Sequence, residues 1–99
     1  MTYQALPPFL HVKDSPIAGQ GLFAKDDIPE GVDLGISHVV VDDEIMRTPL
    51  GGFVNHNDIP NCDKWPEKQD WGNIYYMKTI RNIKRGEELF LKYTFYSVT

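Results

Sequence analysis

Short apolar stretches alternate with turn-forming residues along the chain. Short apolar runs, some with alternating polar positions, predict strands over residues 9–13, 22–24, 32–41, 74–80 and 89–96. The third of these stretches ends in three consecutive valines, whose branched side chains favour extended backbone. No apolar stripe of helical period is long enough to predict a major helix. The pattern therefore predicts a mainly β protein made of many short strands.

Two segments lack this alternation. Residues 42–49 are expected to hold one helical turn that ends before its final proline, because the residue before a proline avoids helical geometry. Residues 62–72 are polar and contain Pro66, which predicts a loop or a hairpin tip. Trp65 and Trp71 are expected to cover the edge of the core, since large aromatic side chains usually serve packing. Stacking on a ligand is the alternative role for them.

Length and composition are those of a single globular domain. The 99 residues are 41% hydrophobic and 24% charged, which argues against a disordered chain. The net charge of -4 argues against direct binding to nucleic acid. One span without lysine or arginine holds seven acidic residues: Asp26, Asp27, Glu30, Asp33, Asp42, Asp43 and Glu44. This acidic span either forms a solvated face or attracts a cationic partner.

The cysteine content and the first residues bear on the cellular location. Cys62 is the only cysteine, so the chain can form neither an internal disulfide nor a multi-cysteine metal cluster. The opening sequence, MTYQALPPFL, contains neither a signal peptide nor a membrane span. We expect a cytoplasmic or otherwise intracellular protein without membrane contact.

Residues 51–61 read GGFVNHNDIPN, a run of polar side chains between apolar ones. Phe53 and Val54 suggest the end of a strand, and the Asn and Asp side chains that follow can satisfy freed backbone groups. Pro60 fixes the direction in which the chain leaves this turn. From these residues alone, an ordinary turn and a ligand site both stay open.

Three blocks occur in order: residues 15–24 (SPIAGQGLFA), residues 51–61, and residues 80–93, which contain RNIKRGEEL. Together they resemble the SET domain family of protein lysine methyltransferases, in a minimal, virus-like form. The middle block is similar to the family's Asn-His-Ser-Cys-x-Pro-Asn motif, with Asn57 and Asp58 in the places of serine and cysteine. The resemblance implies a β-clip fold of short curved sheets with a C-terminal pseudoknot, in which the Asn-His segment is threaded beneath the last segment.

The resemblance also implies an activity and a site. The activity is S-adenosylmethionine-dependent N-methylation of a lysine in a protein or peptide substrate, by in-line transfer to the deprotonated amine. By similarity, residues of two blocks bind the cofactor: Gly19, Gln20, Gly21, Asn55 and His56. Tyr93 follows the Gly-Glu-Glu-Leu sequence and takes the place of the family's catalytic tyrosine, whose hydroxyl positions the amine and the methyl group.

Ordinary structural roles compete with these assignments. The glycines also suit a plain turn, and Tyr93 also suits an aromatic strand. We expect His56 to contact the cofactor through backbone atoms without transferring a proton. His11 and His38 lie in strand-like stretches without a partner motif, so we expect both to be structural.

Acidic side chains near these blocks are assigned to structure rather than to catalysis. Within the Gly-Glu-Glu-Leu sequence, Glu88 is expected to be a structural partner and Glu87 a solvated residue. No metal site is expected, because His56, Asp58 and Cys62 match no spacing of structural zinc sites.

The chain departs from the family pattern in two places. Residues 32–50 are a much shorter insert than usual between the first two blocks, and only residues 94–99 follow the tyrosine, so a post-SET region is nearly absent. Residues 1–99 are therefore expected to form a single minimal SET domain. In the family, the two reduced regions help to hold the substrate and complete the lysine channel. Their reduction predicts either a homodimer through Phe95 and Tyr96 or a tail that folds back on its own core.

These departures motivate an alternative function. A noncatalytic SET-like module would use the acidic span to recognise a basic partner protein. If the chain is viral, either function would operate inside the host cell.

Overall fold

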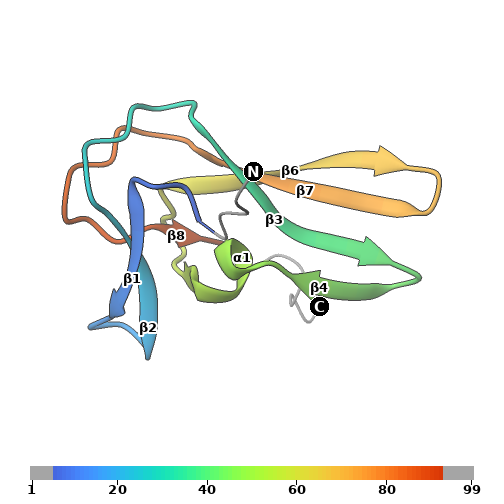
Figure 1. The fold of residues 1–99 in the computed structure, drawn as a ribbon, viewed down its shortest axis with the longest axis horizontal. Helices are drawn as coiled ribbons and strands as arrows, with labels where there is room; N and C mark the ends of the chain where they lie inside the picture. Colours follow the sequence, from blue (N-terminus) through green and yellow to red (C-terminus); the bar gives the residue numbers. More distant parts are fainter. Residues whose placement is uncertain (1–5, 93–99) are drawn as a thin grey trace.

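The computed structural model describes residues 6–92, which form eight strands and one short helix (Figure 1). In chain order these elements are β1 (Leu10–Asp14), β2 (Gln20–Ala24), β3 (Asp33–Val41), β4 (Glu44–Arg47), α1 (Pro49–Phe53), β5 (Asn55–His56), β6 (Cys62–Gln69), β7 (Gly72–Thr79) and β8 (Phe90–Leu91). The described part of the chain is therefore mainly β, as the sequence pattern predicts.

The strands form three small sheets. Strands β1 and β2 form an antiparallel hairpin, β4-β3-β7-β6 form a four-stranded antiparallel sheet, and β5 pairs with β8 in parallel. In Figure 1 the β3–β4 and β6–β7 hairpins extend to one side of the molecule, and the β1–β2 hairpin runs across the other end. This arrangement leaves the short β5–β8 pair between the two larger sheets.

The hydrophobic core lies where these sheets meet. It is built from twelve buried residues: Leu10, Leu22, Ala24, Ile28, Leu34, Leu50, Val54, Cys62, Met77, Ile83, Leu89 and Leu91. Members come from β1, β2, β3, α1, β6, β7 and β8, so one cluster holds all three sheets together. Burial of these apolar side chains is the main force that fixes the sheets against one another.

Four of the predicted strands are confirmed, since residues 9–13, 22–24, 32–41 and 74–80 coincide with β1, β2, β3 and β7 to within a few residues. The predicted strand over residues 89–96 begins as the two-residue β8, and its part from residue 93 lies outside the described residues.

The helical turn predicted for residues 42–49 is wrong. Asp42 and Asp43 have positive φ angles of 49° and 65°, and this tight turn returns the chain as β4. Aspartate tolerates left-handed geometry, and two such residues in succession make the turn that suits a twisted hairpin. Pro49 then begins α1 instead of ending a helix, because the first turn of a helix needs no N–H from that residue. Phe53 ends this helix, so it does not end a strand as expected.

Of the loop or hairpin tip predicted for residues 62–72, only the tip is found, at Asp70 and Trp71, because most of the segment is strand β6, which pairs with β7. Pro66 is compatible with this strand since β6 is an outer strand whose only neighbour in the sheet is β7. At an edge, the missing N–H of proline removes no required ladder hydrogen bond. Trp65 and Trp71 are 43% and 50% exposed, so they do not cover the core edge as predicted.

Candidate functional site

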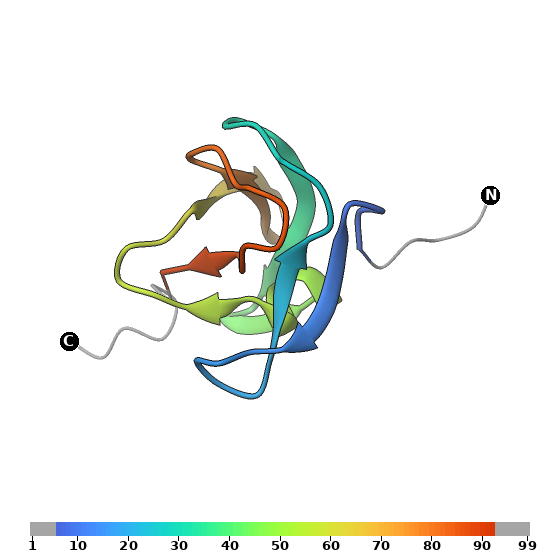
Figure 2. The ribbon, with the colours of Figure 1, turned by 90° about the vertical axis from the view of Figure 1, so that its left-hand side faces the viewer.

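The parallel β5–β8 pair places the Asn-His motif beside the segment that follows Gly-Glu-Glu-Leu. Asn55 is opposite Phe90, and His56 is opposite Leu91. The two strands run side by side in Figure 2, near the centre of that view. The amide of Asn57 extends the pairing by donating to the carbonyl of Leu91 at 3.3 Å. The proximity that the family resemblance implies is thus present, while the threading of a pseudoknot stays a prediction.

Asn61 clamps the same two segments together. Its side-chain amide donates to the carbonyl of Glu88 at 2.8 Å, and its side-chain oxygen accepts from the amide of Phe90 at 2.7 Å. The residue is buried, with 7% of its surface exposed. A buried amide with both ends bonded to backbone fixes the register of the segments that it joins. Asn61 ends the Asn-His motif, but the motif alone predicts no role for it.

A buried carboxylate lies at the centre of the site. Glu88 is 8% exposed and accepts hydrogen bonds from the Ser15 hydroxyl, at 2.8 and 2.9 Å from its two oxygens, and from the Asn55 side-chain amide at 2.8 Å. Hydrogen bonds to an ionised acceptor are stronger than those between neutral groups. Glu88 therefore joins all three sequence blocks, which confirms the structural role expected for it, and Glu87 is exposed as expected.

The Asn55 side chain also holds the loop between β1 and β2. Besides Glu88, its amide approaches the carbonyls of Ala18 at 3.1 Å and Gln20 at 3.3 Å. The loop is closed on itself by the amide of Ser15, which donates to the carbonyl of Gly19 at 2.8 Å. The structure thus brings the Gly19–Gly21 segment and Asn55 into one site.

Gly19, in the turn before β2, and Gly21, the second residue of β2, are required for different reasons. Gly19 has a φ of +49°, a turn geometry that residues with a Cβ rarely adopt. At Gly21, a Cβ would lie 2.2 Å from Glu88 Oε2 and 3.0 Å from Asn55 Nδ2. Gly21 is therefore needed where the backbone packs against the buried carboxylate, whether or not a ligand is present.

His56 lies at the surface of the site, with 41% of its side chain exposed. Its Nε2 is 3.1 Å from Oδ1 of Asp58, which is itself 85% exposed. The His56 imidazole therefore has a carboxylate partner, Asp58, within the same motif. Tyr93, the predicted catalytic residue, and the tail residues Phe95 and Tyr96 lie outside the described residues.

His38 is a buried member of β3, 2% exposed, with Nδ1 2.9 Å from the hydroxyl oxygen of Ser37. Burial lowers its pKa to about 4, and the positive charges of Lys64 and Arg47 act in the same direction. His38 is therefore neutral near pH 7, which fits the structural role expected for it.

Cys62 belongs to the hydrophobic core. It is fully buried, and burial raises the pKa of its thiol to about 12, so the thiol stays protonated. Among residues 6–92, no group of three or more His, Cys, Asp or Glu side chains is arranged to hold a metal ion. No helix in this part of the chain has the length and apolarity to cross a membrane.

Comparisons with known proteins agree with this geometry. The family model for the SET domain matches residues 34–94. No curated protein matches the sequence. The structure is similar to the crystal structure of a candidate histone methyltransferase from Plasmodium falciparum, with a TM-score of 0.71 and 20% sequence identity over 89% of this chain and 94% of that chain. The two proteins share a fold.

Proposed function

The chain belongs to the SET domain family, and from that premise we propose that it is an S-adenosylmethionine-dependent protein lysine N-methyltransferase. The observation that carries the proposal is the hydrogen-bonded junction at Glu88, which ties the Gly19–Gly21 loop to the β5–β8 pair. This junction unites the three blocks on which the resemblance rests.

The residues present fit the cofactor. Gly19 and Gln20 are exposed, and Gly19 has left-handed backbone, whereas Gly21 is buried at the start of β2. Asn55 of β5 reaches this segment through its side chain, and His56 follows it in the same strand. Gly19, Gln20 and Gly21 would hold the methionine part, and Asn55 and His56 would contact the cofactor through main-chain atoms. The Asn55 side chain is already bonded to Ala18 and Gln20 of the loop, so its part is to position that loop. When bound, the cofactor supplies a methyl group attached to positively charged sulfur.

The remaining chemistry concerns the substrate amine. A lysine with an ordinary pKa must lose its proton before it attacks, which costs about 4 to 5 kcal/mol at neutral pH. A buried amine beside a positive charge loses its proton more easily. The hydroxyl of Tyr93 would orient the amine for in-line attack, a contribution made by positioning.

A second function, noncatalytic recognition of a basic protein, is favoured by the acidic span. All seven of its acidic residues are exposed: Asp26, Asp27, Glu30, Asp33, Asp42, Asp43 and Glu44. Exposed charge of one sign attracts partners of the opposite sign and raises their rate of association. Methyl transfer would require Asn55 and Tyr93, whereas recognition of a basic protein by the acidic span would not.

The test combines calorimetry with S-adenosylmethionine and transfer of a labelled methyl group to a lysine-rich protein. We expect Tyr93→Phe to keep cofactor binding but to lose about 10²-fold in transfer rate, the loss typical of removing one positioned donor. Asn55→Ala should weaken cofactor binding, because the loop loses its anchor. Asn57→Ala, a change of the same type that leaves the Glu88 junction intact, is the control.

Absence of measurable cofactor binding by the unaltered protein would overturn the methyltransferase proposal. Capture of a basic protein that survives both Asn55→Ala and Tyr93→Phe would instead support the noncatalytic module.

A further inference from the structure

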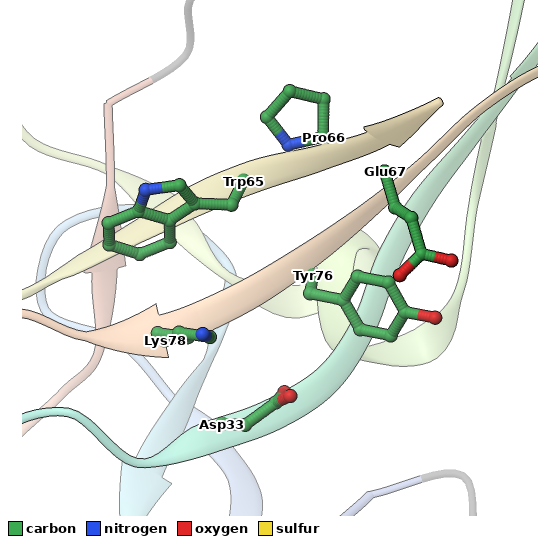
Figure 3. Close-up of a pocket in the computed structure, with 6 residues that line it drawn as sticks. All are labelled: Asp33, Trp65, Pro66, Glu67, Tyr76 and Lys78. Carbon is green, nitrogen blue, oxygen red and sulfur yellow. The ribbon is translucent and has the colours of Figure 1, made fainter. Parts of the chain in front are cut away.

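An open pocket of about 270 Å³ lies on one face of the four-stranded sheet, away from the Glu88 junction. Six residues line it: Asp33, Trp65, Pro66, Glu67, Tyr76 and Lys78 (Figure 3). None of them belongs to the predicted cofactor site. The pocket therefore needs an explanation of its own.

The strand register explains why these side chains gather. Alternate residues of a strand point to the same face, so Trp65 and Glu67 of β6 share a face, as do Tyr76 and Lys78 of β7. The pairing sets Trp65 opposite Tyr76, and Asp33 of β3 opposite Lys78. Figure 3 shows the two aromatic rings and the two carboxylates around one opening.

The chemistry of the lining suits a cation. Trp65 is 43% exposed, although large aromatic side chains are usually buried. The face of an aromatic ring attracts ammonium and guanidinium groups. The carboxylates of Asp33 and Glu67, both exposed, can accept charge-assisted hydrogen bonds from such a group.

The chain itself already places an ammonium group on this ring. Nζ of Lys78 lies 5.7 Å from the centroid of the Trp65 ring. On the same face, Lys78 is opposite Asp63 of β6 as well as Asp33 of β3. Three carboxylates, those of Asp33, Asp63 and Glu67, thus accompany one lysine, which leaves the neighbourhood of the pocket net negative.

The charge of the rest of the protein favours a basic partner here. The net charge is -4, and the exposed residues Asp26, Asp27 and Glu30 lie on the segment that leads into β3. Long-range attraction of this kind concentrates cationic ligands near the surface that carries the opposite charge.

We propose that this pocket binds an arginine or lysine side chain of a basic peptide, with the cation against Trp65 and Tyr76 and its N–H groups donating to Asp33 and Glu67. This binding goes beyond methyl transfer and does not depend on it. In a methyltransferase, the pocket would hold a basic stretch of the substrate at a distance from the methylated lysine.

The test is a fluorescence titration with a hexa-arginine peptide and without cofactor. The substitution Trp71→Phe leaves Trp65 as the only tryptophan, so its emission reports on the pocket. We expect a saturable change in emission. Asp33→Asn with Glu67→Gln should weaken binding about tenfold, as expected for the loss of two charge-assisted contacts.

The matched control is Asp43→Asn with Glu44→Gln, which removes the same charge at the β3–β4 turn. Circular dichroism verifies that each variant is folded. A saturable signal that only the pocket pair weakens supports the proposal. No change in Trp65 emission, or equal weakening by both pairs, overturns it.

Lys78 provides an independent measurement, because in this proposal it competes with the ligand for the Trp65 ring. The control is Lys68→Met, which removes the same charge at an exposed position of β6 outside the pocket. Lys78→Met should increase the affinity for hexa-arginine several-fold more than this control does. Equal effects of the two substitutions, or weaker binding by Lys78→Met, contradict the proposal.

Discussion

At the scale of single residues, Glu88 is a carboxylate whose partners come from distant parts of the sequence. Ser15 and Asn55 donate to it, and it fills the space that a Cβ on Gly21 would occupy. Glu88→Gln replaces an acceptor by a donor and weakens this network. We expect it to lower the free energy of unfolding by about 1 to 3 kcal/mol and to weaken cofactor binding.

Glu87→Gln is the control for this prediction, because it changes the charge equally at an exposed neighbouring position. Its effect on stability should stay within about 0.5 kcal/mol, the range typical of surface changes. Urea denaturation and cofactor calorimetry measure both variants. Equal losses of stability and of cofactor affinity in the two variants would contradict the role assigned to Glu88.

His38 predicts a dependence of stability on pH. Burial lowers its pKa to about 4, whereas in the unfolded chain its pKa is about 6.5. The unfolded chain therefore binds the proton more tightly, and stability is complete above about pH 6.5 and falls as the pH drops toward 4. Between pH 7 and pH 5 we expect this residue to account for a loss of about 2 kcal/mol.

Urea denaturation at pH 7 and pH 5 measures this loss in the unaltered protein and in His38→Gln. The glutamine variant has no imidazole at this position, so its stability should change less between the two values. The same pH dependence in both proteins would show that His38 does not cause it.

At the scale of elements, helix α1 contains two adjacent glycines with opposite surroundings. A Cβ on Gly51 would lie 2.1 Å from the carbonyl oxygen of Ser37, whereas a Cβ on Gly52 would have no neighbour within 4 Å. Gly51→Ala should destabilise the protein by about 1 to 3 kcal/mol, because backbone must move. Gly52→Ala should stabilise it by up to about 1 kcal/mol, since alanine favours helix. Denaturation midpoints of the two variants test this contrast, and a shift of both in one direction contradicts it.

The strands that sequence patterns predict are those that carry core residues in apolar runs. Strand β2 is buried from Gly21 to Ala24, β1 begins with the buried Leu10, and β3 buries Leu34. Strand β6 carries no such run, because most of its residues beyond Cys62 are exposed. With Pro66 inside it, the local pattern of residues 62–72 predicts a loop or a hairpin tip, and pairing with β7 extends the strand up to the tip. The turn at Asp42 and Asp43 does not stand out in the sequence, because aspartate is favoured both in turns and at helix starts.

At the scale of the whole molecule, the sequence motifs indicate which blocks lie together but not how they are joined. Gly19, Gly21 and Asn55 stood out by their order in the chain, and the structure brings them together. The bonds from Ser15 to Glu88 and from Asn61 to the segment at Phe90 could not be read from one sequence. Such contacts depend on side-chain positions that only tertiary packing sets.

The junction at Glu88 has a consequence for synthesis of the protein. Ser15 and Glu88 are 73 positions apart. Strand β5 can pair with its parallel partner β8 only after Leu91 has been synthesised. Contacts between such distant positions form slowly, because loop-closure entropy is lost before they contribute. On the ribosome, the early hairpin and the Asn-His strand therefore emerge long before the residues that complete them. During that interval, strand β5 has no pairing partner, and such an exposed strand edge favours contacts with other chains.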